Sequence, residues 1–169
     1  QASRANVPVV FDVNVRPTIW ATNEDLMRAC KPVLQAATVL KLSLDDAAHL
    51  WGATHAGDVL ECIQPYTPRV VVVTDGSRGV FRLNPVSGAI DHFPVFPVDA
   101  IDPTGAGDAF TAALVTRLAA NGWNTPSDDD IRFAMAAGAL ATTRQGAMAA
   151  LPTHDDLQAF LKTQVHIEP

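Results

Sequence analysis

Short apolar runs alternate along the chain with longer segments whose apolar residues recur at helical spacing. The runs at 7–12 (VPVVFD), 37–43 (ATVLKLS) and 69–76 (RVVVVTDG) are rich in β-branched residues and end in polar or turn residues. Such runs are typical of strands buried on both faces. The intervening segments 23–37 and 57–64 follow helical spacing, although Pro32 interrupts the first. The alternation predicts a parallel sheet built from β–α units.

A hairpin is predicted where this alternation stops. The segments 80–84 (VFRLN) and 89–96 (AIDHFPVF) read as strands, and the residues between them are rich in turn formers. Three further helices are expected at 108–121, 127–143 and 154–161. The predicted fold is therefore a doubly wound α/β fold with a mostly parallel sheet and an antiparallel hairpin at one edge.

Length and the absence of internal repeats or low-complexity linkers predict one domain across 1–169. The first residue is Gln1, and the segment QASRANVPVVFDVN resembles the end of a helix that runs into a strand. We therefore expect the sequence to begin inside a fold.

Charge and apolar content exclude some functions. The net charge of −6 argues against nucleic-acid binding, which needs a cationic surface. No apolar run approaches 20 residues and no signal peptide is visible, which argues against a membrane protein. Cys30 and Cys62 form no CxxC pair and are predicted to be free thiols in a cytoplasmic protein. The five histidines show no metal-binding spacing and are assigned no role.

The segment GAGD at 105–108 carries the clearest chemistry. Gly105, Ala106 and Gly107 have almost no side chains, and the start of a helix leaves backbone amides open to an anion. Asp108 follows directly and could accept a proton from a hydroxyl. Phosphoryl transfer to an alcohol needs an oriented nucleophile and compensation of charge, and these residues provide both. An arbitrary GxGD more often serves only as a tight turn with a helix cap.

Two other phosphate-binding signatures are absent. The sequence contains no GxxxxGK[ST], and Phe110 occupies the position where a GxGxxG motif needs its third glycine. The P-loop and dinucleotide-binding interpretations are therefore disfavoured.

The stretch VDAIDPTGAGDAFTAAL at 98–114 resembles the C-terminal signature of the ribokinase-like carbohydrate kinases, which include fructokinase, ketodeoxygluconate kinase and ribokinase. Segments 11–20, 40–52, 71–81 and 141–152 resemble the same family in the same order. The resemblance implies that Asp108 is the base that activates the sugar hydroxyl. It also implies that the GAG residues before it form the anion hole for the transferred phosphoryl group.

Two loops would then bind ligands. Asn14 and Arg16 follow a strand at its carboxyl end, where open α/β sheets bind ligands, and Arg16 could pair with a phosphate or a substrate carboxylate. A structural salt bridge is the alternative for Arg16. The resemblance implies that Thr74, Gly76 and Gly79 line the ATP phosphates and ribose, whereas the turn alone would be an ordinary hairpin.

Three positions depart from the family pattern. The family motif Asn-x-x-Glu appears as SLDD at 43–46, which places Ser43 at the nucleotide and Asp46 where it could hold a magnesium-bound water. Helix capping is an equal alternative for Asp46. Met135 stands where relatives often carry an Asn beside the adenine, and a methionine can pack against a purine.

The resemblance implies ATP and Mg²⁺ as cofactors, and it raises the question of potassium. Asp102 and Thr104 resemble positions that help bind a monovalent cation in many members, with further oxygens near Gly146. Whether K⁺ is needed is left open by the sequence.

The predicted function is an ATP-dependent sugar kinase that transfers the γ-phosphoryl group to a hydroxyl of a ketose or sugar acid, of the fructose or 2-keto-3-deoxygluconate type. Family members are about twice this length, and the resemblance assigns most sugar contacts and a lid to their N-terminal half. The expectation is thus an enzyme portion that could be inactive alone. The alternative is a truncated, non-catalytic module that binds nucleotide or a partner, either a second copy or the N-terminal half.

Overall fold

The computed structural model describes residue 5 and residues 7–164. The chain divides into two compact units, Gln1–Phe93 and Pro94–Pro169. The helix end expected before Val7 lies outside the described residues except for Ala5, and His166 lies outside them as well. Within the described part, no helix combines the length and apolar character needed to cross a bilayer.

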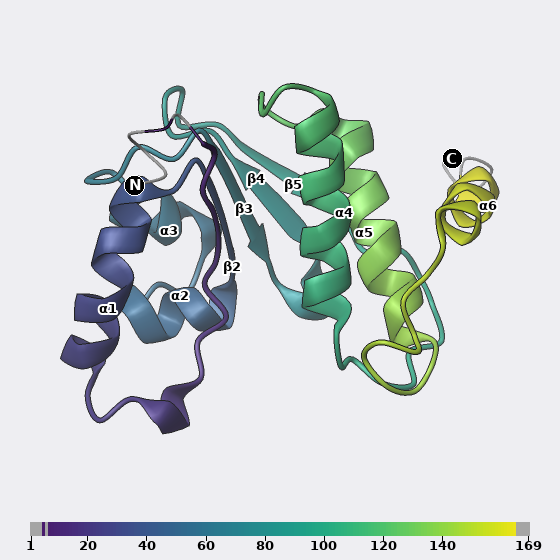
Figure 1. The fold of residues 1–169 in the computed structure, drawn as a ribbon, viewed down its shortest axis with the longest axis horizontal. Helices are drawn as coiled ribbons and strands as arrows, with labels where there is room; N and C mark the ends of the chain where they lie inside the picture. The colour runs from purple at the N-terminus through teal and green to yellow at the C-terminus, as the bar shows by residue number, and fades with distance from the viewer. Residues whose placement is uncertain (1–4, 6, 165–169) are drawn as a thin grey trace. The chain divides into compact units, whose positions relative to one another are not determined.

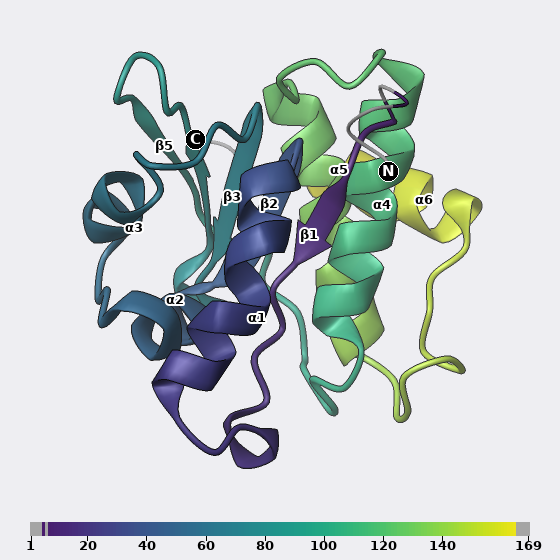
Figure 2. The same ribbon diagram turned by 60° about the vertical axis from the view of Figure 1, so that its left-hand side comes forward.

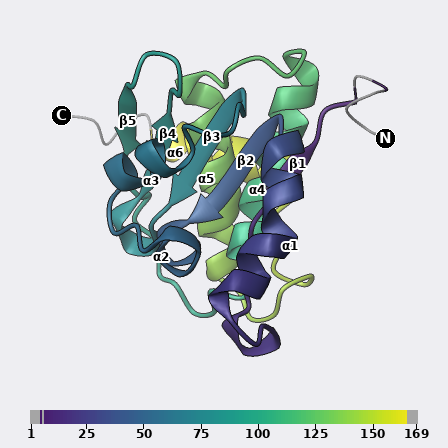
Figure 3. The same ribbon diagram turned by 90° about the vertical axis from the view of Figure 1, so that its left-hand side faces the viewer.

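The first unit contains a five-stranded sheet whose spatial order follows the chain (Figure 3). Strands β1, β2 and β3 run parallel, and β4 and β5 add an antiparallel hairpin at one edge. Their bounds are β1 Val10–Asp12, β2 Val39–Ser43, β3 Val70–Thr74, β4 Val80–Leu83 and β5 Ile90–Phe93. The predicted parallel sheet with an antiparallel edge is confirmed, as a mixed sheet with two parallel and two antiparallel pairings.

Three helices of the first unit lie on one face of this sheet (Figure 1): α1 Asn23–Ala36, α2 Leu44–Trp51 and α3 Ala56–Cys62. The core between them contains Leu40 and Leu42 of β2 and Val71 and Val73 of β3. Because side chains alternate along a strand, Lys41 points to the opposite face, where its buried ammonium pairs with Asp12 at 3.2 Å. Pro32 lies inside α1 and does not end it.

The hairpin strands are shorter than predicted, and 94–96 belong to no strand. Asn84 forms the turn, since its side-chain oxygen accepts hydrogen bonds from the amides of Val86 and Ser87, both at 3.0 Å. Arg82 and Asp91 pair across the two strands at 2.8 Å. The side chains that fix this hairpin are therefore turn and cross-strand residues.

The second unit is built on α4 Ala106–Ala120 and α5 Asp128–Thr142, which lie side by side (Figure 2), followed by α6 His154–Gln164. Leu114, Leu118 and Ile131 are fully buried. A Cβ added at Gly138 of α5 would lie 3.2 Å from the Ala106 carbonyl oxygen, so the glycine permits close helix packing. Helix α4 begins two residues before the predicted start at Asp108.

Candidate active site

Gly105 is the residue on which the start of α4 depends. It is the N-cap, with a left-handed backbone (φ +82°) that glycine adopts without strain. A Cβ at this position would lie 3.1 Å from both the Cα and the Cβ of Ala147, so the 147 backbone packs directly on the turn. The Thr142 carbonyl oxygen accepts the amides of Ile101 and Asp102 at 2.7 and 3.0 Å. The segment 142–147, which is far from the turn in sequence, therefore holds it in place.

The backbone amides that follow Gly105 differ in what they bind. The Ala106 amide donates to the Pro103 carbonyl at 3.2 Å, so it is used within the turn and differs from the open amide expected there. The amides of Gly107 and Asp108 have no acceptor among the described residues. These two N–H groups, together with the positive end of the α4 dipole, form a site suited to an anion.

Asp108 lies in the first turn of α4 and is exposed. In the part of the chain that the structure describes, its carboxylate makes no hydrogen bond or ion pair, so both oxygens are available. An accessible carboxylate beside open amides has the arrangement that a base needs next to a phosphoryl acceptor. The role of Asp108 as base stays a prediction.

Asp102 connects the DPTG turn to the segment after α5. Its carboxylate accepts the amides of Thr104 and Gly146, both at 2.9 Å. Hydrogen bonds from the Thr104 side chain and from these two amides lower the pKa of Asp102. The structure therefore brings Asp102, Thr104 and Gly146 together, with Gly146 contributing an N–H group. The potassium site predicted here stays a prediction.

Asn14 and Arg16 lie on an exposed loop directly after β1. The side chains of Val13 and Val15 are buried in the core, so the alternating residues Asn14 and Arg16 face outward. Asn14 has a left-handed backbone (φ +47°), which is uncommon for a residue other than glycine. The Arg16 guanidinium donates to the Asn14 side-chain oxygen at 2.5 Å and to the Val15 carbonyl at 3.2 Å. Among the described residues it forms no salt bridge, the alternative considered for it.

Ser43 and Asp46 form a capping box at the start of α2. The Asp46 amide donates to the Ser43 hydroxyl oxygen at 3.0 Å, and one Asp46 carboxylate oxygen accepts the Ser43 amide and hydroxyl at 2.8 and 2.7 Å. The other oxygen accepts the Val15 amide at 2.7 Å. Of the two roles considered for Asp46, the helix cap is present. Three of about four lone-pair positions are occupied, so a magnesium-bound water could use only the fourth.

Thr74 ends β3, and Gly76 and Gly79 lie in the tight turn that follows it. The Asp75 amide donates to the Gly79 carbonyl at 2.8 Å, and Arg78 binds the Asp75 carboxylate through two hydrogen bonds of 2.7 Å. Both glycines have positive φ, and a Cβ at Gly79 would collide with the Phe93 carbonyl oxygen. The turn is held by its own contacts, and the nucleotide role of these residues stays a prediction.

Met135 is buried on α5, with 6% of its surface exposed. Packing against an adenine would use only that exposed edge of the side chain. No group of three or more His, Cys, Asp or Glu side chains within the described residues could hold a metal ion. A cation bound by the described residues would therefore also need oxygens from the backbone, from hydroxyl groups, from a ligand or from water.

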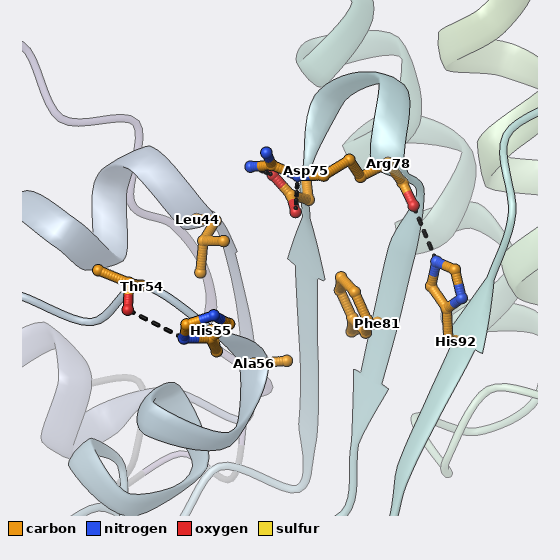
Figure 4. Close-up of a pocket in the computed structure, with 8 residues that line it drawn as sticks. All are labelled: Leu44, Thr54, His55, Ala56, Asp75, Arg78, Phe81 and His92. Carbon is orange, nitrogen blue, oxygen red and sulfur yellow. Dashed lines mark hydrogen bonds and ion pairs between the residues drawn. The ribbon is translucent and has the colours of Figure 1, made fainter.

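The first unit also contains a pocket of about 570 Å³ that sequence reasoning missed (Figure 4). It lies between the start of α3 and the hairpin strands, where Phe81 stacks on His92 with ring centroids 4.7 Å apart. The His92 ring nitrogen Nε2 lies 2.8 Å from the Arg78 carbonyl oxygen. Its lining residues are Leu44, Thr54, His55, Ala56, Asp75, Arg78, Phe81 and His92. The lining comes from four separate segments and follows no local motif, so no signal in the sequence marks it.

The mixed sheet, the helices on it and the glycine-capped start of α4 define the class of protein: a ribokinase-like α/β fold. The family model of the pfkB family carbohydrate kinases matches residues 1–154, which is most of the chain. The chain belongs to the pfkB family of carbohydrate kinases.

Individual relatives are sugar kinases. The chain is 39% identical over 164 residues to a fructokinase of Klebsiella pneumoniae, covering 94% of this chain and 52% of that protein. It is 34% identical over 157 residues to the aminoimidazole riboside kinase of Salmonella typhimurium, covering 92% and 49%. The chain thus spans about half the length of the curated relatives that it matches.

Solved structures agree with this relationship. A Vibrio cholerae fructokinase double mutant in its fructose, ADP and potassium ion bound form matches with a TM-score of 0.85 and 34% identity, covering 95% of this chain and 52% of that one. The Salmonella enterica aminoimidazole riboside kinase complexed with aminoimidazole riboside and an ATP analogue matches with a TM-score of 0.82 and 31% identity, covering 94% and 54%.

Proposed function

We propose that this chain is the nucleotide-binding and catalytic portion of an ATP-dependent sugar kinase. The acceptor would be a hydroxyl of a ketose or sugar acid, of the fructose or 2-keto-3-deoxygluconate type. Family membership and the fructokinase relatives support this proposal. The observation that carries it is the exposed Asp108 carboxylate beside the two open amides at the start of α4.

In the proposed reaction, Asp108 accepts the proton of the attacking sugar hydroxyl. The amides of Gly107 and Asp108 donate hydrogen bonds to the transferred phosphoryl group, and the α4 dipole adds favourable electrostatics. Gly105 and Ala106 contribute by fixing the turn that aims these amides. Arg16 and Asn14 would bind the sugar, since the exposed guanidinium can pair with a carboxylate or phosphate of the substrate.

The proposed nucleotide contacts of the first unit are Ser43, Thr74, Gly76 and Gly79, at and beyond the carboxyl ends of β2 and β3. In the second unit, the proposed nucleotide contact is Met135 on α5. Bound Mg²⁺ would neutralise charge on the phosphates, with Asp46 contacting only a metal-bound water through its remaining lone pair. Asp102 and Thr104 would be the side chains near a potassium ion. The donor set is oxygen, which suits both of these hard cations.

A second candidate function is a non-catalytic module that binds nucleotide or a partner. In this alternative the chain would bind ATP at the same residues without turning over any sugar, and the chain spans about half the length of the curated relatives that it matches. The partner would be a second copy of this chain or the remaining half of a kinase.

The experiment is ATP-dependent phosphorylation across a panel containing fructose, 2-keto-3-deoxygluconate and aminoimidazole riboside, with Asp108→Asn as the test variant. Asp129→Asn is the matched control, since Asp129 is an exposed acid in the first turn of α5. We expect Asp108→Asn to lower kcat by at least about 100-fold while ATP binding persists, and Asp129→Asn to have little effect. Equal activity of Asp108→Asn and the unmodified chain would exclude the base role. ATP binding without turnover of any sugar would favour the binding module.

A further inference from the structure

The carboxylate of Asp46 joins the start of α2 to a loop whose Val15 lies 31 residues earlier in the sequence. Its Oδ1 accepts the Val15 amide at 2.7 Å, and its Oδ2 accepts the amide and hydroxyl of Ser43 at 2.8 and 2.7 Å. Asp46 is 8% exposed, so these three hydrogen bonds form largely away from water. A helix cap requires only the bonds to Ser43, and the bond to Val15 is additional.

The Val15 amide depends on this additional bond. The ladder between β1 and β2 continues as far as the Val13 amide, which donates to the Lys41 carbonyl at 3.0 Å. Beyond that point the chain turns through Asn14, whose left-handed backbone takes it out of strand geometry. Val15 is buried again, and its amide would lack an acceptor if Asp46 were absent. Asp46 therefore replaces the missing strand partner.

The position of Arg16 follows from that of Val15. The Arg16 guanidinium binds the Asn14 side chain and the Val15 carbonyl, so it is held by its own loop. Its Nε and Nη2 make no hydrogen bond within the described residues and are available to a ligand. A shift of the Val15 backbone would move both Asn14 and Arg16.

We infer that Asp46 is a positioning residue for the loop that carries Asn14 and Arg16, here called the sugar loop. Through one oxygen it holds the loop that carries Asn14 and Arg16, and through the other it holds Ser43, which the proposed function assigns to the nucleotide. The inference rests on the proposed function only for the identity of the two ligands, the sugar and the nucleotide. Asp46, which stands where the family's Asn-x-x-Glu pattern has glutamate, thus has a structural role in this chain.

The first test measures amide hydrogen exchange by ¹H–¹⁵N spectroscopy on the chain itself. In Asp46→Ala, the Val15 amide should exchange at least about 10-fold faster than in the unmodified chain, because it loses its acceptor. Exchange at Val71, in the core of β3, corrects for any change in global stability. Ser43→Ala weakens the cap but keeps the Oδ1 bond, so Val15 should stay protected. Unchanged exchange in Asp46→Ala, or equal loss of protection in both variants, would overturn the inference.

The second test is the kinase assay described above, with Asp46→Asn. The asparagine cannot accept all three donors, because one oxygen becomes an NH₂ group. We expect the KM for the sugar to rise about 10-fold, with a smaller change in kcat. Asp130→Asn is the matched control, since Asp130 forms the same capping box with Ser127 and is also buried.

The control separates positioning from stability. Asp130→Asn should destabilise the protein at least as much, because it also weakens the Arg117 ion pair, yet leave the sugar KM unchanged. A fall in kcat alone in Asp46→Asn, or the same KM change in both variants, would overturn the inference. If no sugar is phosphorylated, the proposed function fails, and the exchange measurement still decides the role of Asp46.

Discussion

Replacing Gly105 with alanine tests the glycine-capped turn most directly. The backbone there has φ +82°, and the left-handed conformation costs an L-residue about 1–2 kcal/mol. The new Cβ would also lie 3.1 Å from the Cα and Cβ of Ala147, so the turn or the 147 backbone must shift. Crowding of this kind typically costs about 1–3 kcal/mol. The expected loss for Gly105→Ala is therefore about 2–5 kcal/mol.

Gly122 provides a control at the other end of the same helix. Its backbone is also left-handed (φ +73°), but the nearest atom to an added Cβ is the Asn124 side-chain nitrogen at 3.6 Å, an ordinary contact. Gly122→Ala should thus lose only the backbone contribution of about 1–2 kcal/mol. Urea denaturation followed by circular dichroism measures both variants. The difference between them isolates the crowding by Ala147.

The two variants should differ more in activity than in stability. A shift at Gly105 re-aims the amides of Gly107 and Asp108, and loss of such a donor typically lowers kcat by about 10²–10³-fold. Gly122→Ala should leave kcat unchanged. Equal destabilisation of the two variants would refute the close approach of Ala147. Full activity of a folded Gly105→Ala would refute the anion-hole assignment.

Two further predictions concern the caps and turns that support the site. Burial disfavours the charged form of Asp130, but hydrogen bonds from Ser127 and Arg117 outweigh it and lower its pKa below the ordinary 3.8. The contribution of the ionised carboxylate to stability should be fully present above about pH 4 and be lost as the pH falls through the lower pKa of the folded state. Thermal unfolding measured as a function of pH checks this, because Asp130→Asn should remove this part of the acid dependence. In urea denaturation, Gly79→Ala should lower the free energy of unfolding by about 3 kcal/mol or more, because the new Cβ meets the Phe93 carbonyl. Gly76→Ala is the control and should lower it by about 1–2 kcal/mol, since the space around Gly76 is open. Equal losses would contradict the close packing at Gly79.

The fold was largely predictable because its signals are local. The runs around Val39 and Val70 are apolar and β-branched, and each became a parallel strand. Asn84 has the side chain that a turn needs, and it formed the hairpin turn. The start of α4 was misplaced by two residues because glycine has a low helix propensity, and only the N-cap geometry of Gly105 shows where the helix begins.

The candidate site was predictable only where its residues are close in sequence. DPTGAGD joins the turn of Asp102 directly to the first helical turn, which carries Asp108, and both formed as expected. The Ala106 amide was misjudged because its acceptor, the Pro103 carbonyl, depends on how the turn closes. The pocket near His92 could not be foreseen, since its walls come from segments that meet only in the folded chain.

Asp46 has one role that its sequence motif predicted and one that it did not. Its spacing from Ser43 identified a capping box as one of two roles, and the structure contains that box. The bond to Val15 spans 31 residues and involves a backbone amide, which any residue type except proline supplies, so no sequence pattern encodes it. Yet this bond connects the loop of Arg16 to the start of α2. A substitution at Asp46 can therefore change how the loop of Arg16 is held without changing any residue of that loop.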